Sequence, residues 1–399
     1  MFRRFANKVI ERILTLSGAI TGVTILFITI FLFKEGAGLF NKPAIEDGYA
    51  LYVNAENPVN SLSPQEIKEM FDSEITDWSR LGGLEQEVML FRIDDLFQIY
   101  PESELGENYE LIPEKLGEVI GEHENIIAFL PRQFAPVASA NVKELPMQAI
   151  STTDFFLGRE WLPTATPSPL FGVLPLVLGT LLVSIVALLI ALPLGLGVAI
   201  YLSELAGERQ RKLLKPVIEL LSGIPSVVYG FFGLVIVAPI VQKVFNLPVG
   251  ETALTGSLIL AIMALPTIIS VAEDAMRNTP RAMREASLAL GATQWQTIYR
   301  VVVPYAKSGI SAAVVLGIGR AIGETMAVLM VTGNAAVMPH SMFESVRTIP
   351  ATIAAELGES PAGGAHYEAL FLLGCILFVI TMVISVSAEL ISKKSHKSI

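Results

Sequence analysis

Residues 285–304 read EASLALGATQWQTIYRVVVP and lie between two long apolar stretches of the chain. Good helix formers run from Pro280 to Leu290, and Thr279 stands directly before them, where a side chain can cap a helix. Gly291 then permits a sharp turn, because glycine readily adopts the left-handed backbone conformation that ends many helices. We therefore predict a helix, a glycine turn and a second helix between two membrane-spanning segments.

The second helix of this pair is predicted over Thr293–Val303. Two interpretations of the pair are open. Its helices either pack against the neighbouring membrane segments, or they present Ala286, Leu290 and Ile298 to a groove on a partner protein. The residue pattern alone does not separate these interpretations.

The composition around this pair is that of a membrane protein, with 52% hydrophobic residues and a mean hydropathy of +0.57 over 399 residues. A helix needs about 20 predominantly apolar residues to cross a bilayer. Six stretches meet this criterion: Ile13–Phe33, Leu174–Leu202, Val217–Val241, Leu254–Val271, Ile310–Val331 and Tyr367–Ile391. The predicted fold class is an all-α polytopic membrane protein with six transmembrane helices.

The basic residues predict the orientation, because Lys and Arg concentrate in cytoplasmic loops. With six spans, four basic segments fall on one side: Arg3, Arg4, Lys8 and Arg12; Arg209, Arg211, Lys212 and Lys215; Arg277, Arg281, Arg284 and Arg300; and Lys393, Lys394 and Lys397. Both termini and the loop 276–305 are therefore predicted to be cytoplasmic. The region 34–172 is then mostly extracytoplasmic.

The region between the first two spans has the composition of an aqueous domain. Residues 34–172 carry 24 acidic and 9 basic residues, so 14 acidic and 19 basic residues remain elsewhere. Strand-like and helix-like segments alternate within residues 45–150: Tyr49–Val53, Pro64–Phe71, Val88–Arg92, Leu111–Ile120 and Asn125–Phe129. We predict an inserted extracytoplasmic α/β domain.

The fifth predicted span contains two ionisable residues, Arg320 and Glu324. A spacing of four places both on one face of a helix, and Gly317, Gly319 and Gly323 are predicted to form a close-packing side near them. Charged residues within a membrane usually mark a transport pathway. Arg320 either contacts a passing oxyanion or pairs with Glu324 as a structural lock, and both roles can coexist.

The third predicted span is interrupted by GIPS, residues 223–226. Such an interruption frees backbone groups that can line a pore, or it is a plain kink against a neighbouring helix. We assign Ser226 and Tyr229 to the substrate pathway, together with Arg320 and Glu324.

The loop resembles the EAA loop of ABC-importer permeases, on the evidence of Glu285-Ala286, Gly291 and Pro304 at the family spacing. Ser287 departs from the usual second alanine, and Val301 and Val303 replace the usual Ile and Leu. The resemblance implies that Glu285, Ala286 and Gly291 belong to coupling helices that fit a cleft in an ATPase subunit.

Two further motifs, ELLSGIPSVVYGFFGL (219–234) and GRAIGETMAV (319–328), resemble phosphate-specific ABC permeases of the PstC type. The likeness covers residues 160–399 throughout and residues 1–33 loosely. It implies the ABC-importer type I permease fold in a bacterial inner membrane. The implied partners are a second, PstA-type permease as heterodimer, an ATPase dimer, an external phosphate-binding protein and the lipid bilayer, with no nucleic acid.

Residues 57–83 resemble part of the periplasmic phosphate-binding protein. In that family a Thr-Asn-Trp turn precedes a strand ending in Arg, and here residues 76–78 (Thr-Asp-Trp) and Arg92 take those places. The binding protein continues with Ser-Gly-Thr, whereas this chain has Ile-Asp-Asp at 93–95. Two carboxylates repel a phosphate dianion. We therefore predict a degenerate lobe that docks the binding protein or shapes the entrance.

The chain is divided into residues 1–34 (N-terminal tail and first span), 45–150 (insertion) and 170–395 (permease domain). It has no GxxxxGK[ST] phosphate loop, so ATP hydrolysis is expected in a separate subunit and the chain is a transport subunit, not an enzyme. No residue spacing indicates a metal site or a cofactor. The alternatives are a molybdate- or sulfate-type oxyanion permease and, from another class, a membrane-anchored phosphate sensor.

Overall fold

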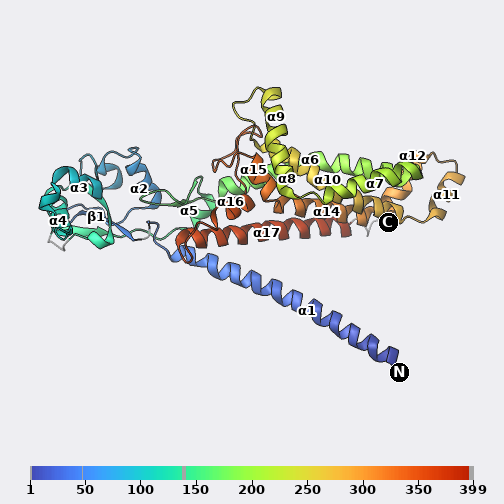
Figure 1. The fold of residues 1–399 in the computed structure, drawn as a ribbon, viewed down its shortest axis with the longest axis horizontal. Helices are drawn as coiled ribbons and strands as arrows, with labels where there is room; N and C mark the ends of the chain where they lie inside the picture. Colours follow the sequence, from blue (N-terminus) through green and yellow to red (C-terminus); the bar gives the residue numbers. More distant parts are fainter. Residues whose placement is uncertain (1, 47, 137–140, 395–399) are drawn as a thin grey trace. The chain divides into compact units, whose positions relative to one another are not determined.

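A computed structural model describes residues 2–46, 48–136 and 141–394 (Figure 1). The chain forms two compact units. The helical unit comprises Met1–Phe33, Leu174–Glu359 and Leu370–Ile399, and the α/β unit comprises Lys34–Val173 and Ser360–Ala369. Lys397 of the predicted basic tail lies outside the described residues.

The helical unit contains these α-helices: α1 (Phe2–Ala37), α6 (Leu174–Ile200), α7 (Glu208–Ser222), α8 (Ser226–Phe232), α9 (Ala238–Phe245), α10 (Ala253–Arg277), α11 (Arg281–Ala289), α12 (Gln294–Thr297), α13 (Val303–Tyr305), α14 (Lys307–Gly323), α15 (Met326–Val331), α16 (Ile349–Glu356) and α17 (Ala365–Lys394). The ends of α1 and α17 belong to the α/β unit.

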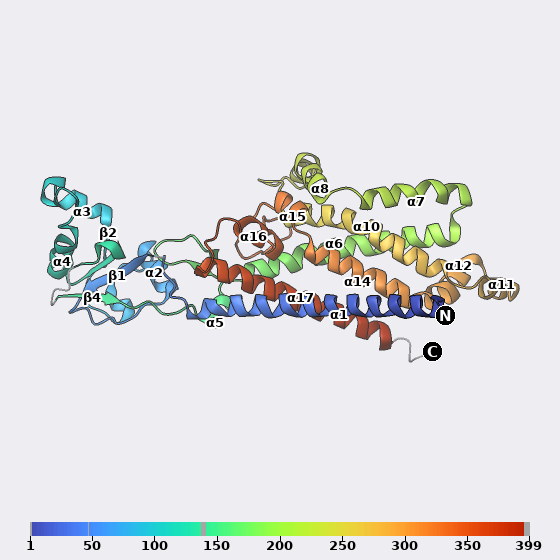
Figure 2. The ribbon, with the colours of Figure 1, turned by 60° about the horizontal axis from the view of Figure 1, so that its bottom comes forward.

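Helix α10 is the core of the helical unit and packs against both α6 and α14, as Figures 1 and 2 show. Small residues make this close approach possible. Ala191, Ala261 and Ala264 are at most 2% exposed at these contacts. A Cβ on Gly195 of α6 would stand only 2.9 Å from the Ile268 side chain of α10, so a larger residue there would push the helices apart.

Within the described residues, five helices are long and apolar enough to cross a membrane, or six if one bent pair is a single span. The first, second, fourth and sixth predicted spans each lie in one such helix. The third prediction is wrong in its limits, because α7 ends at Ser222 and the apolar helix begins only at Ser226. The fifth is also broken, since α14 ends at Gly323; it meets the criterion only together with residues 294–305, across a bend of 72°.

The α/β unit is built on a four-stranded sheet of order β2-β3-β1-β4. Its strands are β1 (Tyr49–Asn54), β2 (Met89–Arg92), β3 (Ile126–Pro131) and β4 (Val142–Leu145). The central strand β1 is antiparallel to β3 and β4, and β2 is parallel to β3. A second small sheet pairs β5 (Trp161–Leu162) with β6 (Leu170–Phe171).

Alternate residues of β1 face two separate hydrophobic cores, as the period of two in a strand requires. Leu51 and Val53 belong to the core beneath α2 (Pro64–Phe71), which is centred on Trp78. Ala50 and Tyr52 belong to the core beneath α4 (Ile112–Glu122). The sheet is thus covered on both faces, which explains why its central strands read as continuous apolar runs.

The five predicted strand and helix segments of this region coincide with β1, α2, β2, α4 and β3 to within two residues. Helix α2 begins with a reciprocal cap, in which the Ser63 amide donates to the Glu66 carboxylate at 2.7 Å and Ser63 Oγ accepts from the Glu66 amide. The helices α3 (Ile93–Ile99) and α5 (Thr152–Leu157) were not predicted from the sequence.

Candidate translocation pathway and coupling element

The first of two helix breaks separates α7 from α8 at Gly223-Ile224-Pro225. Tyr229 of α8 is 6% exposed, and its hydroxyl donates to the Leu221 carbonyl at 2.8 Å. That carbonyl belongs to the last turn of α7, where backbone acceptors lack helical partners. Tyr229 therefore bridges the break, and Ser226, the first residue of α8, lies half-buried beside it.

The second break separates α14 from α15 and changes the predicted relationship between Arg320 and Glu324. Helix α14 ends at Gly323, and Glu324 is extended at φ −72° and ψ 132°. The prediction that the two residues share a helix face is therefore wrong. Glu324 Oε1 instead accepts a long hydrogen bond of 3.5 Å from the Ala327 amide in the first turn of α15. Within residues 2–46, 48–136 and 141–394, no ion pair involves either residue.

Arg320 lies half-buried near the end of α14. Its Nε atom is buried and has no hydrogen-bond partner within the described chain. Its charge is close enough to act on the Tyr229 phenol of α8. The guanidinium is thus within electrostatic reach of Tyr229 and has no paired carboxylate in the described residues. A permanently charged planar group in that setting is suited to bind an oxyanion.

Three glycines of α14, Gly317, Gly319 and Gly323, do not form one close-packed side as predicted. A Cβ on Gly317 would meet Ile268 at 2.8 Å, so this residue is needed where α14 crosses α10. Gly319 and Gly323 have nothing within 4 Å of that position, and for them the predicted packing role is wrong.

The predicted helix–glycine–helix element is present as α11 and α12, with Gly291 between them at φ +83°. The amide of Gly291 donates to the Leu288 carbonyl, and the amide of Ala292 donates to the Ser287 carbonyl. This pair of bonds is the Schellman arrangement that ends a helix through a left-handed residue. A Cβ at this position would meet nothing within 4 Å, so space does not demand glycine here. The positive φ of Gly291 does.

Two contacts hold this element on Glu204, in the π-helical turn Tyr201–Leu205 that continues α6. Arg284 Nη2 donates to Glu204 Oε1 at 2.8 Å, and Gln294 Nε2 donates to the Glu204 backbone carbonyl at 2.9 Å. A third contact joins the two helices, since the hydroxyls of Ser287 and Thr297 lie 2.9 Å apart. The sequence analysis missed all three contacts. Ser287, a departure from the family pattern, therefore has a partner of its own.

The remaining surface of α11 and α12 exposes several large apolar side chains among polar ones. Leu290 is 89% exposed and Trp295 60% exposed, and Glu285 and Ala286 are exposed beside them. Ile298 was predicted to be part of this surface, but it is 1% exposed and packs inward.

The predicted Thr279 cap is also wrong. Pro280 occupies the cap position of α11, and the Thr279 hydroxyl forms no hydrogen bond among the described residues.

In the α/β unit, Arg92 ends β2, and α3 begins immediately at Ile93. The Asp95 carboxylate accepts a hydrogen bond from the Arg92 amide at 2.7 Å. The backbone donor at the start of this helix is thus paired with a carboxylate of the chain itself.

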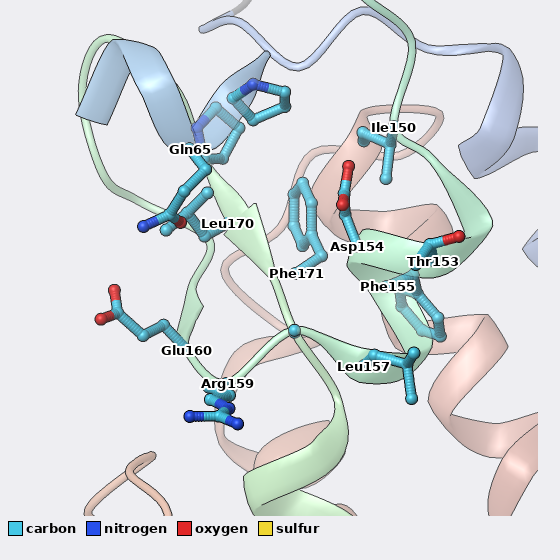
Figure 3. A pocket seen from close by; sticks show the side chains of 14 residues that line it. Gln65, Ile150, Thr153, Asp154, Phe155, Leu157, Arg159, Glu160, Leu170 and Phe171 are labelled. Atoms are coloured by element: carbon cyan, nitrogen blue, oxygen red, sulfur yellow. The ribbon is translucent and has the colours of Figure 1, made fainter. Parts of the chain in front are cut away.

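A pocket of about 390 Å³ lies elsewhere in the α/β unit, between α5 and β6 (Figure 3). Its wall is mainly apolar and includes Ile150, Phe155 and Phe171, and Glu160 at its rim is paired with Lys68 at 3.4 Å. None of the predicted site residues lines it. The described part of the chain also has no group of three His, Cys, Asp or Glu residues that could hold a metal ion.

Comparison with known proteins gives matches to transport permeases. A family described as "Binding-protein-dependent transport system inner membrane component" matches residues 191–397. The "Probable ABC transporter permease protein YqgH" of Bacillus subtilis is 42% identical over 59% of this chain and 76% of its own length. The "Phosphate transport system permease protein PstC" of Mesorhizobium japonicum is 41% identical over 59% of this chain and 78% of its own.

A solved structure of the MetNI methionine ABC transporter covers 55% of this chain and 94% of that chain, at 18% identity and a TM-score of 0.44, which is too low to support an inference. The sequence relatives confirm the resemblance to PstC-type permeases. The chain therefore belongs to the family of binding-protein-dependent transport system inner membrane components.

Proposed function

We propose that this chain is the membrane-spanning permease subunit of an ATP-driven phosphate importer and forms half of its translocation pathway. The substrate is supported by relatives named as phosphate permeases, at 41% and 38% identity. The pathway is supported by one observation above all, the half-buried Arg320 guanidinium that has no ion-pair partner among the residues described.

The proposed arrangement is the type I permease fold with six spans and both termini in the cytoplasm. The basic loops support this orientation, because Lys and Arg favour the cytoplasmic side. The region 34–172 then lies outside the bacterial inner membrane. The partners would be a PstA-type permease as heterodimer, two ATPase subunits and an external phosphate-binding protein.

In the pathway, the Arg320 guanidinium would bind the phosphate oxygens through its planar fork. Ser226 lies at the other helix break and offers a hydroxyl to the same anion. Tyr229 would act mainly by holding α7 against α8, because its hydroxyl is already bonded to Leu221. Glu324 would orient α15 through Ala327.

Coupling to ATP would run through the exposed surface of α11 and α12, with Glu285, Ala286 and Gly291 in the first helix and its turn. An apolar surface carrying Leu290 and Trp295 suits insertion into a groove of the ATPase. The Arg284–Glu204 pair would transmit the movement of that surface to α6.

The α/β unit would dock the phosphate-binding protein or shape the entrance without binding phosphate itself. This role is supported by the Asp95 carboxylate, which already accepts from the Arg92 amide.

Uptake by the complete transporter in proteoliposomes tests the proposal. Labelled phosphate should enter only with ATP and loaded binding protein, and excess sulfate or molybdate should not compete. Efficient competition by either anion would identify a general oxyanion permease. ATP-independent binding without uptake would identify a sensor.

A further inference from the structure

A basic cleft of about 760 Å³ lies in the helical unit where α7, the end of α10 and the start of α11 meet. The proposed transport function assigns no role to it. Six of the residues that line it are basic: Arg211, Lys212, Lys215, Arg277, Arg281 and Arg284. Only two acidic residues, Glu208 and Glu219, share the wall.

Acidic neighbours already neutralise most of these cations. Glu273 of α10, which is 1% exposed, pairs with both Arg211 and Lys215, and the Lys215 distance is 2.8 Å. The hydrogen bond to Glu273 raises the pKa of Lys215, so this side chain stays charged. These ion pairs hold the wall of the cleft in place. Because Arg211 and Lys215 are paired with Glu273, the net positive charge of the cleft comes from its other basic residues.

Two arginines of the cleft remain available. Arg277 ends α10 and Arg281 begins α11; both are exposed, and neither forms an ion pair within the described ranges. They are separated by three residues at the turn between the two helices. Their guanidinium groups can therefore approach one ligand from two sides.

The turn between these arginines adds polar groups of the kind that bind anions. Thr279, which lines the cleft, is 2% exposed, and its Oγ1 has no hydrogen-bond partner in the described structure. A buried hydroxyl without a partner is destabilising, so a ligand that bonds to it is favoured. Pro280 at the start of α11 provides no side-chain cap. The free backbone amides at the start of this nine-residue helix therefore attract negative charge.

We propose that this cleft binds a phosphate-bearing anion, held by Arg277 and Arg281. Arginine forks match the tetrahedral oxygens of a phosphate group, and several donors from different elements favour a multiply charged anion over a single carboxylate. The bound anion would fasten the end of α10 to the coupling helix α11 and so stabilise its position. That consequence for coupling rests on the proposed function, whereas binding itself does not.

Two sources can supply this chemistry. One is the headgroup of an anionic phospholipid, since basic pockets between membrane helices bind such headgroups on the cytoplasmic side. Leu213 and Leu220 of α7 are 69% and 71% exposed, which gives acyl chains an apolar surface on the same helix. The other source is inorganic phosphate on the side to which the transporter would release it.

The test uses the assembled transporter in nanodiscs of phosphatidylcholine, without binding protein or nucleotide. One arm measures labelled inorganic phosphate by equilibrium dialysis. The other adds a minor fraction of phosphatidylglycerol and counts retained lipid by native mass spectrometry. The variant R277Q/R281Q is compared with the control K243Q/K307Q, which removes the same charge from exposed residues outside the cleft.

We expect R277Q/R281Q to weaken binding of at least one probe about tenfold or more, while the control stays within about twofold of the unchanged transporter. Loss of lipid retention alone identifies the headgroup, and loss of phosphate binding alone identifies the free anion. Equal binding of both probes by all three proteins, or binding of neither by the unchanged transporter, overturns the proposal. The proposal is also overturned if R277Q/R281Q binds both probes normally but no longer retains the ATPase subunit, because the two arginines would then contact that subunit.

Binding in the cleft is separable from the transport pathway. The R320K variant should lose phosphate uptake and keep full binding at the cleft. If R320K also abolishes binding of both probes, the measured site is the pathway and no second site exists.

Discussion

Arg284 of α11 donates to the Glu204 carboxylate in the π-helical turn Tyr201–Leu205 that continues α6, with 2.8 Å between Nη2 and Oε1. The same guanidinium group donates to the carbonyls of Met276 and Thr279. One side chain thus ties α6, α10 and α11 together, at the point where an ATPase would act on the permease.

Replacing Arg284 by Ala should destabilise this junction by about 3 kcal/mol, because the Glu204 side chain, 9% exposed, loses its partner. Binding-protein-stimulated ATPase activity should fall with it. Thermal unfolding of the purified complex and its ATPase rate measure both effects. The control is Lys212→Ala, whose pairing with Glu208 is at the surface and contributes about 0.5 kcal/mol or less. Equal stability of the two variants would show that the buried pair has no structural role.

Gly291→Pro should uncouple ATP hydrolysis from transport, because proline fixes φ near −65° and cannot adopt the observed +83°. Gly291→Asn is the matched control, since asparagine tolerates the left-handed region. It should retain most of the uptake. The measurement is ATPase stimulation by loaded binding protein, together with uptake. Normal ATPase stimulation in the proline variant would show that Gly291 has no role in coupling.

Arg320→Lys should abolish phosphate uptake and leave complex assembly intact, because lysine keeps the charge and loses the bidentate fork. Glu324→Gln should reduce uptake far less. Glu324 accepts a hydrogen bond from the Ala327 amide, and the side-chain oxygen of glutamine can accept the same bond. Uptake and size-exclusion profiles of the two variants are compared. A pathway role for Arg320 is excluded if its lysine variant transports phosphate normally. A loss of equal size in both variants would restore the ion-pair interpretation.

Tyr229→Phe should lower the stability of the complex by about 1 kcal/mol, because the Leu221 carbonyl loses its donor across the helix break. The KM for phosphate should not change if this hydroxyl acts on the helix break alone. Uptake kinetics and thermal unfolding separate the two properties. A raised KM with unchanged stability would instead place the hydroxyl on the substrate.

The isolated fragment 45–150 should not bind phosphate, since Asp94 and Asp95 stand where the binding protein offers donors, and Asp95 already accepts from the Arg92 amide. Calorimetric titration with phosphate tests this, after circular dichroism has shown that the fragment is folded. Micromolar affinity would contradict the prediction. The same fragment should retain the phosphate-binding protein on a column if it is the docking site.

Features set by local chemistry could be predicted from the sequence alone. The turn at Gly291 follows from the freedom of glycine at positive φ, and the strands β1, β2 and β3 follow from short apolar runs between turn residues. The long apolar helices follow from composition and length. In each case the cause lies within a few residues of the element itself.

Tertiary structure decided how the charged residues pair. The spacing of Arg320 and Glu324 predicted one helix face, but the helix ends at Gly323 and Glu324 is extended. Glu204 meets Arg284 across 80 positions of the chain, and Glu273 meets Arg211 across 62. Sequence spacing carries no information about contacts that only the packing of α6, α7, α10 and α11 creates. The sequence alone thus determined the family, the membrane class and the turn at Gly291, while the packed helices decided which charges are neutralised and which have no partner among the described residues.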